Sequence, residues 1–336
     1  MIIKKFISGN RFLPAYLVLW ALVLWFDAFV FYKQTSFVIP ENPAPLYELI
    51  IFVFSDVAFL NVLVAFVFVI VQAFMINNLL TSKNLVERNS FLPALIYVTL
   101  MSFSFKMFGL NPVLFANFFI IIALDKIFDV YNEEEVFLEV FNVGLLIGVA
   151  SLFYLPAFVF YLLLLAALAV YFLIRLRGFL SSLLGFMTPW FFTVVYYYLS
   201  DQLSGWIETF FDSLVLFKLF SYNFQLFSEV FFIFIALVSI VALFRTYTFF
   251  VKGKPVRIRK RFTVLAYFIL FSVLSSFFVV ESFTEHFAMI LIGLSPVIAV
   301  MFQEIKRRYI KELIFSLIVI LIIAGKLNYF GYVHFF

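Results

Sequence analysis

The sequence predicts an all-α fold, a polytopic bundle of transmembrane helices, and three observations support that prediction. Of the 336 residues, 66% are hydrophobic and 12% are charged, whereas a soluble domain keeps about a quarter of its residues charged. The mean hydropathy is +1.15. The apolar residues gather in runs of about 20, the length that a helix needs to cross a bilayer. We therefore expect one integral membrane domain over residues 1–336.

Apolar windows of that length predict eleven spanning helices. They fall near residues 13–32, 56–80, 91–107, 110–128, 138–154, 156–174, 179–199, 226–245, 262–280, 286–303 and 312–330. Pro14, Pro93, Pro112 and Pro156 each lie in the first turn of a predicted span, where a missing N–H costs nothing. The basic start leads into an apolar run without a small-residue cleavage site, which indicates a retained first helix.

The positions of Lys and Arg predict the orientation, because cytoplasmic segments carry the excess of positive charge. With the N-terminus inside and the C-terminus outside, most of the 23 Lys and Arg residues fall on the inner side. The outer side keeps Lys33, Lys106, Lys218 and Lys326. This pattern predicts a multipass protein with a defined orientation in the membrane, and the lipid bilayer is its first partner.

Two outer segments have the pattern of helices that lie on the membrane surface. In residues 203–220, apolar residues recur at i, i+3, i+4 and i+7, while Ser204, Glu208 and Asp212 occupy the opposite face. The segment PLYELIIFVF (45–54) leads into the second span, and we expect it to lie flat before the chain turns inward.

Ionisable groups at membrane depth are costly, so those that occur are candidates for function. Asp27, near the outer end of the first span, and Asp56, at the outer start of the second, are expected at similar depth. Two such carboxylates can act as a general base and a metal anchor, or as a proton-coupled pair. The alternative is that both reach the headgroup layer and are solvated.

At the mouth of the tenth span, Glu285 and His286 place a carboxylate beside an imidazole, a second candidate catalytic pair. A lone His at an interface is, however, more often a satisfied surface residue. Within the spans, Asn61, Gln72 and Asn117 are intramembrane polar positions. Interhelical hydrogen bonds are their usual explanation, and the lining of a transport path is the alternative.

Gly144 and Gly148 stand four residues apart in the fifth span, and this spacing predicts close packing against another helix. The inner loop VKGKPVRIRKR (251–261) is basic. We predict that its charges contact anionic lipid headgroups through Arg257, Arg259, Lys260 and Arg261. Its place beside the membrane accounts for these charges, so no nucleic-acid partner is expected.

Several motifs are missing from the sequence. The chain has no Cys, which excludes a disulfide framework and a Cys metal site. It also lacks a Gly-rich phosphate loop, H-E-x-x-H and G-x-S-x-G. These absences argue against an ATPase and a zinc protease, and no motif identifies a cofactor.

Three segments resemble an uncharacterised multipass inner-membrane family of Bacteroidota: PLYELI (45–50), residues 77–103 and residues 285–320. This resemblance implies a multipass protein of a bacterial inner (cytoplasmic) membrane, but it implies no activity.

A second resemblance is to the GT-C-type polyprenyl-dependent glycosyltransferases. The Pro-initiated short span at 91–106, the hairpin segment at 112–129 and the F-x-x-G-x-x-x-G helix at 141–148 are similar to their membrane half. The resemblance implies a catalytic acidic residue in the first outer loop, and Asp27 is the nearest candidate by position. Here that loop is short and lacks an Asp-x-Asp pair.

These observations leave three classes of function open. The first is a GT-C-like cell-envelope enzyme acting on lipid-linked sugars or envelope glycans. The second is a transporter or lipid flippase, and the third is a non-catalytic membrane subunit or scaffold that binds other envelope membrane proteins.

Overall fold

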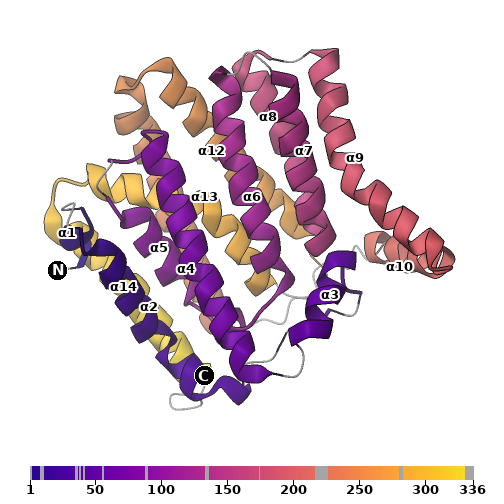
Figure 1. Ribbon diagram of the computed structural model, residues 1–336. Helices are drawn as coiled ribbons and strands as arrows, with labels where there is room; N and C mark the ends of the chain where they lie inside the picture. Colours follow the sequence, from indigo (N-terminus) through magenta and orange to yellow (C-terminus); the bar gives the residue numbers. More distant parts are fainter. Residues whose placement is uncertain are drawn as a thin grey trace.

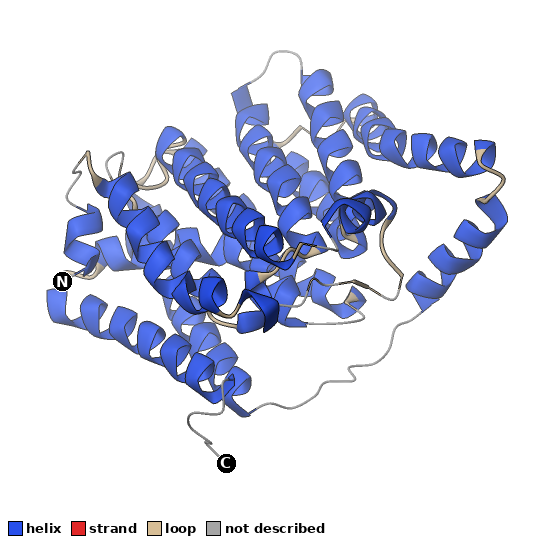
Figure 2. Cartoon of the chain, turned by 60° about the horizontal axis from the view of Figure 1, so that its bottom comes forward, coloured by secondary structure: helices blue, strands red, loops and turns tan. Residues whose placement is uncertain are grey.

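In the computed structural model, the described residues form helices joined by short turns, with no strand among them (Figure 2). The structure describes residues 2–7, 11–34, 37, 39–40, 42–54, 57–87, 90–132, 136–173, 175–215, 226–279 and 283–329. Figure 1 shows the longer helices running roughly side by side, as expected of a membrane bundle.

Fourteen α-helices are described, and short 3₁₀ or π segments extend or connect several of them. Their bounds are α1 Ile2–Ile7, α2 Leu13–Val30, α3 Pro45–Phe54, α4 Ala58–Ser82, α5 Leu92–Met101, α6 Pro112–Asp129, α7 Val136–Phe153, α8 Phe160–Tyr171, α9 Leu176–Leu199, α10 Leu203–Val215, α11 Leu226–Arg245, α12 Val256–Ser275, α13 Phe283–Glu304 and α14 Arg308–Tyr329. Each of the eleven predicted ranges overlaps one of these helices.

Seven of the described helical stretches are long and apolar enough to cross a membrane, judged by length and composition. They are Leu13–Val30, Ala58–Ser82, Val136–Phe153, Leu176–Leu199, Glu229–Gly253, Val256–Phe278 and Phe283–Glu304. This confirms a multipass helical protein suited to a lipid bilayer. Of the two predicted surface helices, α3 has the predicted bounds, and α10 follows the prediction to Val215; residues 216–220 lie outside the described residues.

Helix α13 is the centre of the bundle. Every residue from Glu285 to Phe302 is buried, including Pro296 in its middle. Helices α5, α6, α11 and α12 all pack against it, and Figure 1 shows it passing through the middle of the molecule. Because its surroundings are entirely protein, α13 can carry polar side chains at depths where lipid would not accept them.

The segment predicted as a span at 91–107 contains a much shorter helix. α5 covers ten residues, about 15 Å of rise, roughly half the hydrocarbon core. The chain then continues through a 3₁₀ turn, Phe105–Phe108, to the start of α6. Non-helical backbone at membrane depth is tolerated where protein surrounds it, and here Ser102, Met107 and Leu110 are buried.

Helix α6 begins where Asn111 accepts a hydrogen bond from the Leu114 amide at 3.0 Å, immediately before Pro112. The residue before a proline avoids the helical region, and Asn111 is extended, with φ −141° and ψ 158°. An Asn cap followed by Pro is a standard start of a helix, so the local sequence fixes the point at which α6 begins.

Helices α7 and α9 pack with their backbones in contact. A Cβ built on Gly144 or Gly148 would overlap the Ser182 or Phe186 carbonyl oxygen of α9. In return, a Cβ on Gly185 would overlap the Phe141 carbonyl oxygen of α7. The close packing predicted from the glycine spacing is therefore confirmed, and Gly185 is the matching small residue on the partner helix.

The three intramembrane amides bond to neighbouring segments of the bundle. Gln72 donates to the Leu114 carbonyl at 2.7 Å and accepts from the Tyr97 hydroxyl at 2.7 Å. Asn61 accepts from the Leu110 amide at 2.6 Å, and Asn117 donates to the Ala288 carbonyl at 3.3 Å. All three amide side chains are almost fully buried. Hydrogen bonding between packed segments of the bundle, in two cases between helices, thus describes these residues.

We expect Gln72→Leu to lower the free energy of unfolding by about 1 to 2 kcal/mol, because it leaves the buried Tyr97 hydroxyl without its acceptor. Thermal unfolding in a mild detergent would measure the change. Adding Tyr97→Phe removes the orphaned hydroxyl, so the double variant should regain part of the loss. A double variant less stable than Gln72→Leu alone would contradict this pairing.

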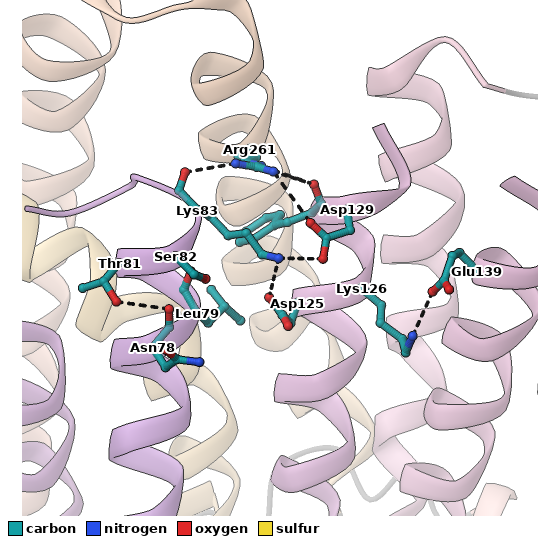
Figure 3. Close-up of polar contacts among 11 residues, drawn as sticks. Asn78, Leu79, Thr81, Ser82, Lys83, Asp125, Lys126, Asp129, Glu139 and Arg261 are labelled. Atoms are coloured by element: carbon teal, nitrogen blue, oxygen red, sulfur yellow. Dashed lines mark hydrogen bonds and ion pairs between the residues drawn. The ribbon is translucent and has the colours of Figure 1, made fainter. Parts of the chain in front are cut away.

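At one end of the bundle, a cluster of charges joins α4, α6 and α12 (Figure 3). Arg261, 3% exposed, donates to the Lys83 carbonyl at 3.0 Å and to the Phe128 carbonyl at 3.0 and 3.2 Å. The Lys83 amino group pairs with Asp125 at 2.9 Å and Asp129 at 2.6 Å. The guanidinium therefore caps the C-terminal ends of two helices, whose last carbonyls lack partners within the helix.

Candidate functional site: an aromatic and acidic cavity

A cavity of about 570 Å³ lies at the opposite end of the bundle from Arg261. Helix α6 runs from one site to the other: Pro112 at its start lines the cavity, and Asp129 at its end belongs to the charge cluster. Helices α3 and α10 both contribute to the wall, and both lie at the lower right of Figure 1. The volume is within the range of pockets that hold small ligands.

Four aromatic rings form one wall and hold α10 onto α9. Trp206 stacks on Tyr197 with ring centres 5.0 Å apart and on Phe210 at 5.5 Å. Trp190 meets Phe210 edge-on at 5.3 Å. Such ring pairs favour offset or edge contacts beyond their burial. The inner side of α10 is thus fixed to the bundle, while Ile207 and Phe211 remain exposed on its outer side, as an interfacial helix requires.

Three carboxylic acids line the cavity: Glu48, Asp201 and Glu285. Glu285 is only 8% exposed, whereas Glu48 and Asp201 are exposed. Glu48 accepts a hydrogen bond from the Tyr197 hydroxyl at 3.1 Å, which ties α3 to α9. Among the described residues, no three His, Cys, Asp or Glu side chains lie close enough to hold a metal ion. The three carboxylates are therefore spread around the wall.

The turn between α9 and α10 places Asp201 at the cavity. Asp201 has φ +57°, a left-handed conformation that Asp tolerates better than most residues. The Gln202 amide then donates to the Tyr197 carbonyl at 3.0 Å, which closes the end of α9. This tight reversal brings the start of α10 back across the cavity.

His286 lies directly behind the cavity wall. It is fully buried, and its Nδ1 is 2.9 Å from the hydroxyl of Tyr154, which lines the cavity. Its Nε2 is 2.9 Å from the Ser272 carbonyl and 3.2 Å from the Ser275 hydroxyl. The imidazole thus connects α13 to α12 and fixes the position of the Tyr154 ring.

The predicted catalytic residues therefore divide between different places. Glu285 lines the cavity and His286 supports it from behind, but Asp27 does not line it. Asp27 instead pairs with Lys326 of α14 at 2.9 Å, and Lys326 also donates to the Leu24 carbonyl and lies 4.5 Å from the centre of the Phe108 ring. Asp56 lies outside the described residues.

The four residues predicted to contact lipid headgroups also differ in their exposure. Arg261 is buried and fully engaged with helix ends, so its guanidinium is turned away from the lipid surface, contrary to the expectation from the basic loop. Arg257 and Arg259 are exposed. The Lys260 amino group lies over the rings of Tyr131 at 4.9 Å and Phe172 at 4.6 Å. Headgroup contact by these three remains a prediction.

Sequence reasoning missed most of the cavity wall, including Glu48, Asp201, Tyr154 and Trp190. Two signals were present. Trp206 and Phe210 belong to the apolar stripe of the predicted surface helix, and Glu48 interrupts the otherwise apolar segment PLYELI. No spacing in the sequence shows that these segments meet, because the described residues of the wall come from five separate stretches of the chain.

Comparison of the chain with family models, with curated proteins and with solved structures gives no match.

Proposed function

We propose that this chain is a GT-C-like membrane enzyme that acts on lipid-linked sugars or envelope glycans. The observation that supports the proposal is the cavity with Glu285 in its wall. A nearly buried carboxylate in an aromatic surrounding is suited to take a proton from a sugar hydroxyl as a general base. Trp190 and Trp206 line the cavity with aromatic surface against which a sugar ring can pack, and Tyr154 offers a fixed phenol.

In this proposal the chain belongs to a bacterial inner membrane, crosses it eleven times and has its N-terminus inside. The ends of the bundle support that orientation. Basic residues gather at the Arg261 end, where Arg257, Arg259 and Lys260 precede it in α12. At the other end, no Lys or Arg occurs among the described residues that line the cavity. The positive-inside rule then directs the cavity outward, toward the compartment where envelope glycans are assembled.

The transporter alternative has less support. Its motivation was the set of amides Asn61, Gln72 and Asn117 together with the kink predicted at Ser295-Pro296 in α13, and none of these residues lines the cavity. Each of the three amides bonds to a backbone group of another segment, as packing residues do.

We expect Glu285→Gln to change the cell-surface glycan profile while the protein still accumulates in the membrane, because the amide keeps the size of the side chain but cannot accept a proton. Glycan electrophoresis of cells carrying the variant would measure this. Glu208→Gln is the matched control, since Glu208 is exposed on α10 and does not line the cavity. Indistinguishable profiles for the two variants and the parent chain would contradict the proposal.

A further inference from the structure

The hydrogen-bond donors in the cavity wall are largely directed at the protein itself. The Trp190 indole donates to the Ser151 hydroxyl at 2.9 Å, and Ser151 donates to the Gly148 carbonyl at 2.7 Å. Thr209 donates to the Gly205 carbonyl at 2.9 Å, and Tyr197 donates to Glu48. Each of these hydroxyl or indole protons already has an acceptor, so a ligand meets few donors on these side chains.

His286 directs the Tyr154 proton away from the cavity as well. The Ser272 carbonyl can only accept, so the His286 Nε2 that faces it at 2.9 Å carries the ring proton. In the tautomer that carries its proton on Nε2, the other ring nitrogen, Nδ1, is an acceptor. The Tyr154 hydroxyl, 2.9 Å from Nδ1, therefore donates to it. What Tyr154 offers to a ligand is its phenol oxygen, which accepts.

The charged residues described in the wall also favour a ligand that donates hydrogen bonds, because they are all acidic. Glu48, Asp201 and Glu285 supply carboxylates, while no Lys or Arg occurs among the described residues that line the cavity. A cleft lined by one sign of charge concentrates ligands of the opposite sign. Trp190, which meets Phe210 edge-on and Trp206 at a tilt, adds an aromatic ring to the wall, and the face of such a ring attracts cations.

From these features we infer that the cavity binds the ammonium group of an amine-bearing ligand and excludes anions. An amino sugar is the form that fits the proposed function, on which this inference rests. Its ammonium group donates to the carboxylates and to the Tyr154 oxygen, and Asn42, Gln202 and Ser204, which can both donate and accept, serve its hydroxyl groups. An ethanolamine headgroup of a lipid carries the same ammonium chemistry.

The test is a tryptophan-fluorescence titration of the full chain in detergent, with D-glucosamine, D-glucose and D-glucose 6-phosphate at equal ionic strength. We expect glucosamine to bind at least about tenfold more tightly than glucose, the scale of one added ion pair, and the phosphate to bind least. Glu285→Gln should weaken glucosamine binding about tenfold, and Glu208→Gln should leave it unchanged. Measurable but equal binding of glucosamine and glucose, tighter binding of the phosphate, or no binding of any amine-bearing ligand would overturn the inference.

Further arms identify the source of the ammonium group and guard against misfolding. Short-chain phosphatidylethanolamine is compared with short-chain phosphatidylglycerol, which lacks the amine. Preference for phosphatidylethanolamine without glucosamine binding supports the ammonium site but counts against a sugar ligand.

If Glu285→Gln lowers the melting temperature, Asp201→Asn replaces it, with the same expected loss of glucosamine binding. An altered glycan profile without amine selectivity would overturn this inference alone, whereas amine selectivity with an unchanged profile would overturn only the proposed function.

Discussion

A Gly185→Leu variant is expected to lose about 3 kcal/mol of stability, because the leucine has no space between α7 and α9. Even a Cβ at this position would overlap the Phe141 carbonyl oxygen, and backbone cannot move aside as a flexible side chain can. Overpacking a tight interior contact costs about 1 to 3 kcal/mol, and a contact with backbone belongs at the upper end. Thermal unfolding in detergent would measure the loss.

The Gly185→Leu variant should also displace part of the cavity wall, since Trp190 and Tyr197 of α9 belong to that wall. Gly185→Ala should fall between the parent chain and the leucine variant. Gly253→Ala is the control, because a Cβ there meets no atom within 4 Å. If Gly185→Leu and Gly253→Ala unfolded at the same temperature, the close contact of α7 and α9 would be refuted.

The sequence contained enough information to predict this contact on one of its two helices. Gly144 and Gly148 have a recognisable spacing, and hydropathy located α7 and α9 to within about three residues. Gly185 has no second glycine four residues away in α9, although Ser181 stands at that spacing, and it was not predicted as a partner. A helix contact needs small residues on both surfaces, but one periodic pattern identifies only one of them.

The shortness of α5 shows a different limit of the sequence. Its apolar run is long enough to suggest a span, yet the helix ends at Met101. Thr99 and Ser102 bond back to the carbonyls of Leu95 and Val98, a pattern that competes with regular helix hydrogen bonding. Hydropathy indicates whether a segment prefers an apolar environment or water. It does not distinguish a helix from buried irregular backbone.

The candidate site was the least predictable part, because its chemistry depends on tertiary contacts. Asp27 and Glu285 are both acidic residues near the ends of apolar runs. The fold gives Asp27 the Lys326 amino group as its partner and places Glu285 in the wall of a cavity. Helices α2 and α14, which form that ion pair, are almost the whole chain apart in sequence, so no local pattern could have separated the two carboxylates.

Arg261 is the residue for which position in the sequence was most misleading, and its replacement should have the largest effect on stability. Four basic residues within five positions suggest a surface patch, yet the last of them is buried. Arg261→Met should cost about 3 to 5 kcal/mol, because two carbonyl groups at helix ends lose their donor and each unsatisfied group costs about 1 to 3 kcal/mol. The substitution leaves the Lys83 and Phe128 carbonyls without their donor. It also removes one of the positive charges that face the Asp129 carboxylate.

Two further variants test whether the geometry of the guanidinium, rather than its charge, is responsible. Arg261→Lys keeps the charge but lacks the planar fork that reaches both carbonyls, so its unfolding temperature should lie between those of the methionine variant and the parent chain. Arg259→Met removes an exposed charge two residues away and should leave the unfolding temperature unchanged. If Arg259→Met were as destabilising as Arg261→Met, the effect would come from the basic stretch as a whole, and the role of Arg261 in joining α4, α6 and α12 would have to be abandoned.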